Sequence, residues 1–479
     1  MKKNSSTALT VFKISSQEVP AYQKFLRAHD VKPEQIITEE DFFKLPVTDK
    51  KSYIQKYTLA ELTKSGRVPP VAYASSGSSG TPTFWFGSDK HEMRGGKIHE
   101  KIFRDVLGLS PHDSTLVIIC LSMGVWVAGS YTLASCREVA RKGWNIMTIT
   151  PGIEMADIMH ILKNLTPNFQ NTILVGYPPF IMDVVTETQR QDIKIGNVIK
   201  IITTGDKFTE EWRDDLLNFL KITNPYSALV SIYGCSDAAV LGYETPLSIF
   251  LRRKMNENNE LFKEIAPANS TILPSVVQYE TEYIFFEEIN GELVFTTDAP
   301  IPLVRYNIHD IGKVITFEEV KHFLEKYTLW EEVRKLGFAQ WELPFLVQSG
   351  RSDVAVTFYA LNIPGDHLKV CVEDKRIKKF LSGNFFAYTK DLDKSRKQRL
   401  YINLELKDGV KLPENIEKII RDVIVENLVR INIEYRKLNS VLGEKSLPII
   451  TLFSHGDKYM PENRSGMARL GGKKPKVIM

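Results

Sequence analysis

This chain of 479 residues contains few cysteines, and its net charge is small. Its four cysteines have neither CxxC spacing nor histidine partners at zinc-finger intervals, which argues against a disulfide framework and a structural metal. A reducing, cytoplasmic setting is therefore expected. Lysine plus arginine (62) exceeds aspartate plus glutamate (58) by only four, and the body of the chain shows no basic cluster, so no nucleic-acid partner is predicted.

Long apolar runs are also missing. The apolar stretch that follows Lys2 and Lys3 ends at Lys13, so it is too short for the apolar region of a secretory signal peptide. The uncharged stretch 114–136 is the best membrane candidate, but small and hydroxyl-bearing residues interrupt it. We expect a buried strand at 115–120, a glycine-containing loop and the start of a helix there, and no membrane span.

From residue 115 to residue 233, apolar β-rich runs alternate with helix-length amphipathic segments. This alternation is typical of a largely parallel sheet covered by helices. Beyond residue 275 the pattern becomes antiparallel, and Asn290-Gly291 is a dipeptide favoured in type I′ hairpin turns. The sequence therefore predicts an α/β body that also contains a β-rich subdomain.

A boundary is expected near residue 350. The remainder mixes predicted strands at 401–406 and 431–435 with a helix at 413–428, and it is long enough to fold alone. We predict an α/β protein with a large N-terminal body, residues 1–350, and a small mobile α+β domain, residues 351–479.

The most informative string is YASSGSSGTPT, residues 73–83. Its glycines let backbone N–H groups approach a polyphosphate closely, and its hydroxyls add further donors. No lysine follows Gly80, so the GxxxxGK[ST] pattern of P-loop NTPases is absent. Taken alone, the string is explained equally well as a flexible Ser/Gly linker.

Six strings, in this order, resemble the motifs of the adenylate-forming enzymes, the acyl- and aryl-CoA ligase group. They are the loop 73–83, GYPPF (176–180), TTGDK (203–207), SIYGCSD (231–237), PLVRYNIHD (302–310) and GRSD (350–353). The nearest resemblance is to phenylacetate-CoA ligases, because of PLVRYNIHD, the short GRSD string and the early LPVTDK (45–50). It covers nearly the whole chain.

The resemblance implies an ATP site. The residues it assigns to the nucleotide are Ser75, Ser76, Gly77, Ser78, Ser79, Gly80, Thr81, Gly205, Asp206, Tyr233, Gly234, Arg305 and Asp310. Tyr233 would stack on adenine, and Asp310 would accept both ribose hydroxyls. A buried tyrosine at a strand end and a turn-capping aspartate are the alternatives. Arg351 would reach phosphate or ribose, against the alternative of a surface salt bridge.

Two positions depart from the family pattern. Asp237 stands where the family usually has glutamate and would help to hold Mg²⁺, but its side chain reaches less far. Thr81 stands where many relatives carry lysine, and Arg305 would supply the missing cation. Either departure would weaken ATP binding.

The resemblance also implies a catalytic lysine, a hinge and an acid pocket. The tail GGKKPKVI, residues 471–478, resembles the family's ending and places the lysine at Lys473. A solvated basic tail is one alternative; a second register, RSGM at 464–467, would put Met467 at that position. Asp353 would be the hinge of the small domain. The predicted pocket residues are Trp126, Tyr177 and Cys235; an ordinary core position is the alternative for Trp126.

The resulting hypothesis is an ATP- and Mg²⁺-dependent ligase that converts a carboxylic acid, expected to be aromatic, into an acyl-adenylate and then a coenzyme A thioester. One alternative acceptor is the phosphopantetheine arm of a carrier protein, or another protein. A second alternative is a non-catalytic nucleotide-binding paralogue. A homodimer is compatible with the sequence.

Overall fold

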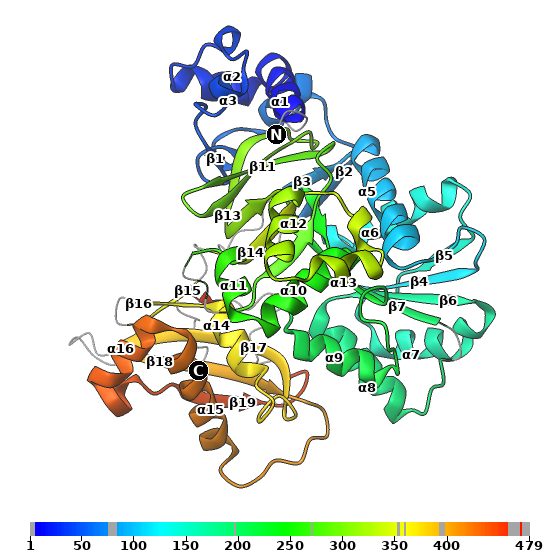
Figure 1. Cartoon of the computed structure of the whole chain (residues 1–479), viewed down its shortest axis with the longest axis vertical. Helices are drawn as coiled ribbons and strands as arrows, with labels where there is room; N and C mark the ends of the chain where they lie inside the picture. The colour runs from blue at the N-terminus through cyan, green and yellow to red at the C-terminus, as the bar shows by residue number, and fades with distance from the viewer. Residues whose placement is uncertain are drawn as a thin grey trace. The chain divides into compact units, whose positions relative to one another are not determined.

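The computed structural model describes residues 5–74, 84–195, 198–268, 270, 272–351, 355–358, 361–391, 398–457 and 470–471. The chain divides into two compact units (Figure 1). The large unit comprises Met1–Lys207, Arg213–Ala268 and Ser275–Gln348, and the small unit comprises Phe208–Trp212, Asn269–Pro274 and Ser349–Met479.

The large unit contains a run of parallel strands in the order β5-β4-β6-β7-β8. These strands are β4 (Thr115–Cys120), β5 (Ile146–Ile149), β6 (Asn171–Gly176), β7 (Val198–Thr204) and β8 (Leu229–Cys235). They are connected through α6 (Val127–Arg141), α7 (Met155–Asn164), α8 (Pro178–Arg190) and α9 (Glu210–Phe219). Every residue of β4 is buried, which explains why its sequence is continuously apolar instead of alternating.

Antiparallel strands continue the same sheet. Beyond β8 the order is β9 (Ala239–Tyr243), β10 (Ser275–Gln278), β14 (Phe345–Arg351), β13 (Leu303–Ile315), β12 (Glu292–Thr297) and β11 (Ile284–Ile289), and β1 (Thr48–Asp49) pairs with β13. The predicted α/β class is confirmed. The antiparallel strands extend the parallel sheet, however, because the β8–β9 hairpin turns the chain back along the sheet edge.

The predicted hairpin turn is also confirmed. Ile289 pairs with Glu292 across Asn290 and Gly291, whose φ angles are +54° and +79°, as a type I′ turn requires. The remaining elements of the large unit are α1 (Ser5–Glu18), α2 (Pro20–Ala28), α3 (Glu39–Phe42), α4 (Leu59–Leu62), β2 (Val71–Ala74), β3 (Phe84–Gly87), α5 (Asp89–Lys101), α10 (Pro246–Glu257), α11 (Asn259–Ile265), α12 (Phe317–Lys326) and α13 (Trp330–Lys335). Helices α1 and α2 pack into a core with β11, β12 and β13.

The small unit has its own core and a sheet ordered β19-β18-β17-β20. Its elements are β15 (Ala355–Phe358), β16 (Leu361–Pro364), α14 (Gly365–Val372), β17 (Leu381–Asp391), β18 (Gln398–Leu406), α15 (Ile416–Ile431), α16 (Ile433–Leu442), β19 (Ile449–Phe453) and β20 (Leu470–Gly471). The predicted strand at 431–435 is wrong. Ile431 is the last residue of α15, Asn432 has an extended backbone, and α16 begins at Ile433. The Asn432 side chain caps α16 by accepting the Tyr435 N–H at 2.8 Å, so a helix end and a helix start occupy this segment.

The uncharged stretch 114–136 forms β4, a loop and the first part of α6, as predicted. Of the helices in the described parts of the chain, none is both long enough and apolar enough to cross a bilayer.

Candidate active site

The carboxyl ends of the parallel strands gather most of the predicted site residues of the large unit that the structure describes. The ends are aligned, because Cys120 pairs with Gly176, Gly176 with Thr203, and Thr204 with Ile232. The predicted residues that end or follow these strands are Trp126, Tyr177, Gly205, Asp206, Tyr233, Gly234, Cys235 and Asp237. In open α/β sheets, ligands bind outside the carboxyl ends of the strands.

Tyr233 and Asp310 are brought together although they are 77 residues apart in the sequence. The Tyr233 hydroxyl donates a hydrogen bond to Asp310 Oδ2 at 2.5 Å. Asp310 lies on β13 and is only 5% exposed, whereas Tyr233 is partly exposed near the end of β8. The two side chains thus place an aromatic ring and a carboxylate side by side, which are the groups that a nucleoside requires.

A second tyrosine–aspartate pair lies near the first. Tyr306 lies four residues before Asp310 on β13, and Asp237 lies four residues after Tyr233, in the turn between β8 and β9. The buried Tyr306 hydroxyl donates to Asp237 Oδ1 at 2.7 Å. Cys235 lies near both carboxylates: burial raises the pKa of its thiol well above the usual value, and the charges of Asp237 and Asp310 raise it further. The thiol is therefore neutral, which favours a wall position and not a nucleophile.

Glycine is required sterically at one of these positions. A Cβ on Gly234 would lie 2.4 Å from the carbonyl oxygen of Ala239, across the β8–β9 hairpin. Gly205 has a φ of +85°, a conformation that other residues rarely adopt. The adjacent Asp206 carboxylate accepts a hydrogen bond from the backbone N–H of Lys207 at 2.8 Å.

The predicted phosphate-loop residues Ser75–Thr81 lie outside the described residues, but both strands that flank them are described. Ala74, the last residue of β2, pairs with Phe84, the first residue of β3. The Ala74 N–H also donates to the Val125 carbonyl at 2.7 Å, beside the half-buried Trp126. Ala74, the last described residue before this string, therefore lies beside the loop that follows β4.

Arg305 makes contacts of a different kind from those expected. Its guanidinium forms a two-point ion pair with Glu287 at 2.9 and 3.1 Å and donates to the backbone carbonyls of Phe43 and Leu45. Both charged side chains are 8% exposed. Burial raises the pKa of Glu287, and the neighbouring Arg305 opposes that rise. These contacts assign Arg305 to the support of the N-terminal segment, since they use most of its donors.

Three predicted residues cannot be placed. Lys473 and Asp353 lie outside the described residues, and only the backbone of Arg351, at the end of β14, is described.

Sequence reasoning missed two residues in this region, Tyr306 beside Asp237 and His91 beside the adjacent Ala238. Tyr306 lies inside the PLVRYNIHD string, so the motif itself was the available signal. Buried His91 on α5 lies with Nε2 3.3 Å from the carbonyl oxygen of Ala238. Burial lowers the His91 pKa to about 4, and the nearby Arg94 charge lowers it further, so the ring is neutral. An isolated histidine on a helix gave no signal for this contact.

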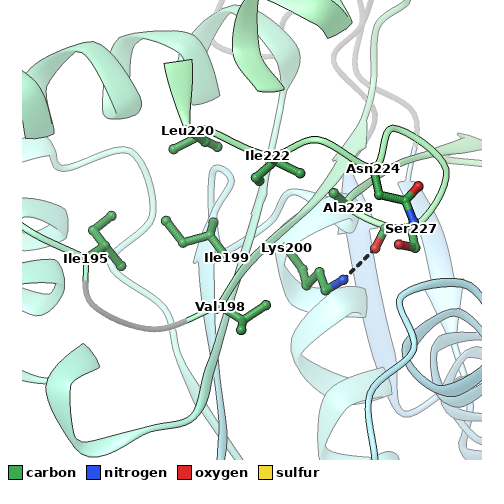
Figure 2. Close-up of a pocket in the computed structure, with 9 residues that line it drawn as sticks. All are labelled: Ile195, Val198, Ile199, Lys200, Leu220, Ile222, Asn224, Ser227 and Ala228. Carbon is green, nitrogen blue, oxygen red and sulfur yellow. Dashed lines mark hydrogen bonds between the residues drawn. The ribbon is translucent and has the colours of Figure 1, made fainter. Parts of the chain in front are cut away.

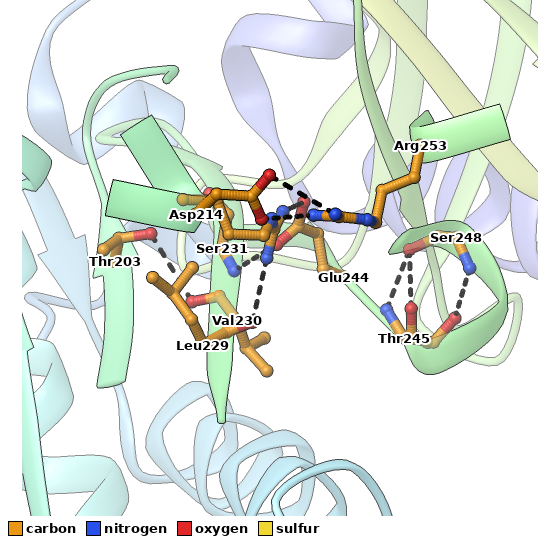
Figure 3. A network of polar contacts seen from close by, with 10 residues as sticks. Thr203, Asp214, Leu229, Val230, Ser231, Glu244, Thr245, Ser248 and Arg253 are labelled. Atoms are coloured by element: carbon orange, nitrogen blue, oxygen red, sulfur yellow. Dashed lines mark hydrogen bonds and ion pairs between the residues drawn. The ribbon is translucent and has the colours of Figure 1, made fainter. Parts of the chain in front are cut away.

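A buried ion pair behind the site was also missed. Arg213 and Glu244 have side-chain exposures of 0% and 4%, and their charged groups lie 2.5 Å apart. Glu244 also accepts the Ser231 N–H at 2.8 Å, while Arg213 donates to the Leu229 carbonyl at 3.1 Å, so the pair ties β8 to residues after β9 (Figure 3). Strand β8 ends in Tyr233, Gly234 and Cys235, so its position sets theirs.

A pocket of about 240 Å³ lies elsewhere in the large unit. It is lined mainly by aliphatic side chains, and Lys200 Nζ donates to the Ser227 carbonyl at 2.8 Å inside it (Figure 2). Val198 begins β7 and Ala228 immediately precedes β8, so the pocket lies at the amino ends of these strands. The pocket and the candidate site therefore lie at opposite ends of the parallel strands.

The side chains of the candidate site could bind Mg²⁺ only if the phosphates of a bound nucleotide supplied further ligands. Among the described side chains, no group of three or more His, Cys, Asp or Glu could hold a metal. Asp237 offers one carboxylate, and Tyr306 fixes one of its oxygens. Mg²⁺ is commonly held by one or two carboxylates together with substrate phosphates and water, so a single aspartate suffices for that mode.

The solved structure of 2-hydroxyisobutyryl-CoA ligase in complex with 2-HIB-AMP matches 94% of this chain and 85% of its own, with a TM-score of 0.63 and 14% identity. The chain has the fold of the adenylate-forming superfamily. The same adenylate-forming fold relates it to an acyl acid amido synthetase in complex with 2,4-DB (TM-score 0.54, 13% identity, 95% and 86% of the two chains). An anthranilate CoA ligase in complex with anthranoyl-AMP matches with a TM-score of 0.51 and 10% identity, over 83% and 65%.

Two curated relatives are phenylacetate-coenzyme A ligases. The one from Pseudomonas putida is 20% identical over 299 residues, 62% of each chain. The one from Aromatoleum evansii is 22% identical over 302 residues, 62% of this chain and 63% of the relative. These matches cover less than two thirds of the relatives' own length. No protein-family model matches the chain. The predicted resemblance to the adenylate-forming superfamily is confirmed.

Proposed function

We propose that this protein is a ligase that activates a carboxylic acid with ATP as an acyl-adenylate and then transfers the acyl group to coenzyme A. The observation that carries the proposal is the pairing of Tyr233 with Asp310 at the carboxyl ends of the parallel strands. An aromatic ring and a carboxylate in contact at this edge suit adenine and ribose. The fold and the distant phenylacetate-CoA ligase relatives support the same conclusion.

In the first step a substrate carboxylate oxygen bonds to the α-phosphorus of ATP, and the bond from that phosphorus to the oxygen between the α- and β-phosphates breaks, so that pyrophosphate leaves with that oxygen. The substrate is already ionised at neutral pH, so no general base is needed. The requirement is to bring two anions together, which needs positive charge and precise placement. Tyr233 and Asp310 would hold the nucleoside, and the residues of the loop 75–81 would donate to the phosphates.

Asp237 is the residue we assign to Mg²⁺. When bound, the ion would neutralise phosphate charge. The hydrogen bond from Tyr306 orients the Asp237 carboxylate before any ligand arrives. Because aspartate reaches less far than glutamate, coordination through water is expected.

The acid would bind beside Trp126, Tyr177 and Cys235. All three follow or end strands whose carboxyl ends are aligned. The neutral Cys235 thiol is a small apolar wall, and two aromatic residues suit an aromatic acid, which is the substrate class we propose.

Lys473 is proposed to be the cation of the adenylation step, and Asp353 the hinge that changes the small unit's position before thioester formation. Loss of one electrostatic stabiliser typically lowers the rate by about 10²–10³. Lys473→Ala should therefore lower acid-dependent pyrophosphate exchange by that factor. A near wild-type rate would discard Lys473 and leave the tail as a solvated basic segment.

A pyrophosphate-exchange screen over aryl, arylacetic and fatty acids tests the proposal. We expect exchange with at least one aromatic acid and, on addition of free coenzyme A, a thioester detectable by mass spectrometry. Exchange without a thioester would indicate a carrier-protein or other protein acceptor. Silence with every acid would reject the enzyme.

A non-catalytic nucleotide-binding protein is the second candidate. The contacts of Arg305 favour this candidate. Arg305 is the cation that was expected to replace the missing lysine at position 81, but its guanidinium is paired with Glu287. Calorimetric binding of ATP without exchange for any acid would support it.

A further inference from the structure

The pocket at the amino ends of β7 and β8 is lined by aliphatic side chains and a small group of polar ones. Three of its nine lining residues, Lys200, Asn224 and Ser227, are polar and lie toward one side in Figure 2. Val198 is 53% exposed, so a ligand can reach the pocket from solvent. Sites for small molecules typically combine an apolar lining with a few polar groups that orient the ligand. The six aliphatic residues are Ile195, Val198, Ile199, Leu220, Ile222 and Ala228.

Lys200 is unusual in its strand. Strands of a parallel sheet that is covered by helices are commonly apolar throughout, and Lys200 interrupts the apolar run 198–202. The residue is half-buried, and burial lowers the pKa of its ammonium group. In the described part of the chain no acidic side chain forms an ion pair with Lys200. A partly buried charge is costly without a partner, and an anionic ligand would supply one.

The polar residues of the pocket supply hydrogen-bond donors. Lys200 Nζ donates to the Ser227 carbonyl at 2.8 Å, and an ammonium group has two further N–H donors. Asn224 Oδ1 accepts the Tyr226 N–H at 2.9 Å, which orients the amide and leaves its NH₂ group as a donor. The nine lining residues, all of them described, include no carboxylate. A positive charge and neighbouring donors without a competing carboxylate suit a carboxylate ligand.

The size of the pocket limits the length of the ligand. A cavity of about 150 Å³ can hold benzene, which has six carbon atoms. The pocket, at about 240 Å³, is about 1.6 times as large, so it holds roughly nine non-hydrogen atoms. A linear carboxylate of about six carbon atoms is within this limit. Because the lining has no aromatic ring on which another ring could stack, a flexible chain is favoured over an aromatic acid.

We propose that this pocket is a second ligand site, which binds a short linear carboxylate such as hexanoate. The chain would pack against the aliphatic side chains, and the carboxylate would accept hydrogen bonds from Lys200 and Asn224. The site is independent of the proposed function, because Val198 and Ala228 lie at the amino ends of strands whose carboxyl ends carry the candidate active site. An acid in the pocket would therefore bind without competing with an acid in the active site.

The test is NMR of the full-length protein labelled at the δ1-methyl groups of isoleucine, because Ile195, Ile199 and Ile222 line the pocket. Substitutions such as Ile222→Val assign their signals. Ile420, in the core of the small unit, is the reference whose signal should not move. Titration with hexanoate should shift the three pocket signals. Butanoate has two methylene groups fewer and should bind about 10- to 20-fold more weakly.

An uncharged ligand and a lysine variant isolate the contribution of charge. Hexan-1-ol keeps the chain without the negative charge, and Lys200→Met keeps much of the apolar side chain without the ammonium group. The wild type should bind hexanoate about 3- to 10-fold more tightly than hexan-1-ol, and Lys200→Met should lose that preference. Lys163→Met is the matched control and should keep it, because Lys163 is exposed on α7 and does not line the pocket.

Two results would overturn the proposal. If a large excess of hexanoate leaves the signals of Ile195, Ile199 and Ile222 unchanged, the pocket does not bind such an acid. If the wild type binds hexanoate and hexan-1-ol equally well, Lys200 does not recognise the carboxylate and its bond to the Ser227 carbonyl is structural. Pyrophosphate exchange reports on the candidate active site alone, so its presence or absence does not decide this test.

Discussion

At the scale of single residues, two substitutions test whether the hydrogen-bonded pair of Tyr233 and Asp310 belongs to a nucleoside site or is a structural contact. Asp310→Asn keeps the shape but loses the negative charge that would accept both ribose hydroxyls. Hydrogen bonds to charged groups contribute about 1.5–3 kcal/mol, so ATP binding should weaken about 10- to 100-fold. Tyr233→Phe keeps the ring for stacking and should have a smaller effect. Calorimetry with ATP measures both; unchanged affinity in Asp310→Asn would make the pair structural.

Cys235 offers a second test at this scale, because its reactivity reports the charges around it. The residue is half-buried, and burial together with the charges of Asp237 and Asp310 raises the pKa of its thiol. Only the thiolate reacts with iodoacetamide, so alkylation at pH 8 should be much slower than for the unfolded chain. Asp237→Asn removes one charge and should lower the pKa and speed the reaction. Mass spectrometry of the Cys235 peptide gives the rates; no difference between the two proteins would contradict the arrangement.

At the scale of elements, the Arg213–Glu244 pair holds β8, the strand that carries Tyr233 near its end. Glu244→Gln would leave the Arg213 charge buried without its partner, which typically costs about 3–5 kcal/mol. Asp214→Asn is the matched control (Figure 3), because the Arg253–Asp214 pair has side-chain exposures of 23% and 46% and should contribute less than about 1 kcal/mol. Urea unfolding compares the two midpoints. A midpoint for Glu244→Gln no lower than the control's would reject the role.

Elements with a strong local signal could be predicted from the sequence. The apolar run 115–120 became β4, and Asn290-Gly291 became the turn between β11 and β12, since each depends on neighbouring residues. The strand predicted at 431–435 was wrong, because a short apolar run is compatible with either a strand or a buried helix face. The partners of Asp237 and Arg305 depend on contacts between distant segments, Tyr306 lying 69 residues from Asp237, and no local pattern encodes them.

At the scale of the whole molecule, two separate cores imply two separable responses to a mutation. Arg305→Met removes the buried partner of Glu287 and leaves the carbonyls of Phe43 and Leu45 without their donor. The large unit should lose about 3–5 kcal/mol of stability. Amide exchange in α15, within the core of the small unit, should keep its wild-type protection. Equal loss of protection in both units would show that they unfold together.

The same substitution has a pH dependence whose sign follows from Glu287. Burial already raises the pKa of this carboxyl in the folded state, and loss of Arg305 removes the charge that opposes the rise. A group whose folded pKa is raised favours folding while it is protonated, and that contribution disappears as the pH rises through the folded pKa. The stability difference between wild type and Arg305→Met should therefore be smaller at pH 5 than at pH 8. Urea unfolding at both values measures it, and a larger difference at pH 5 would mean that Glu287 is not the group left uncompensated.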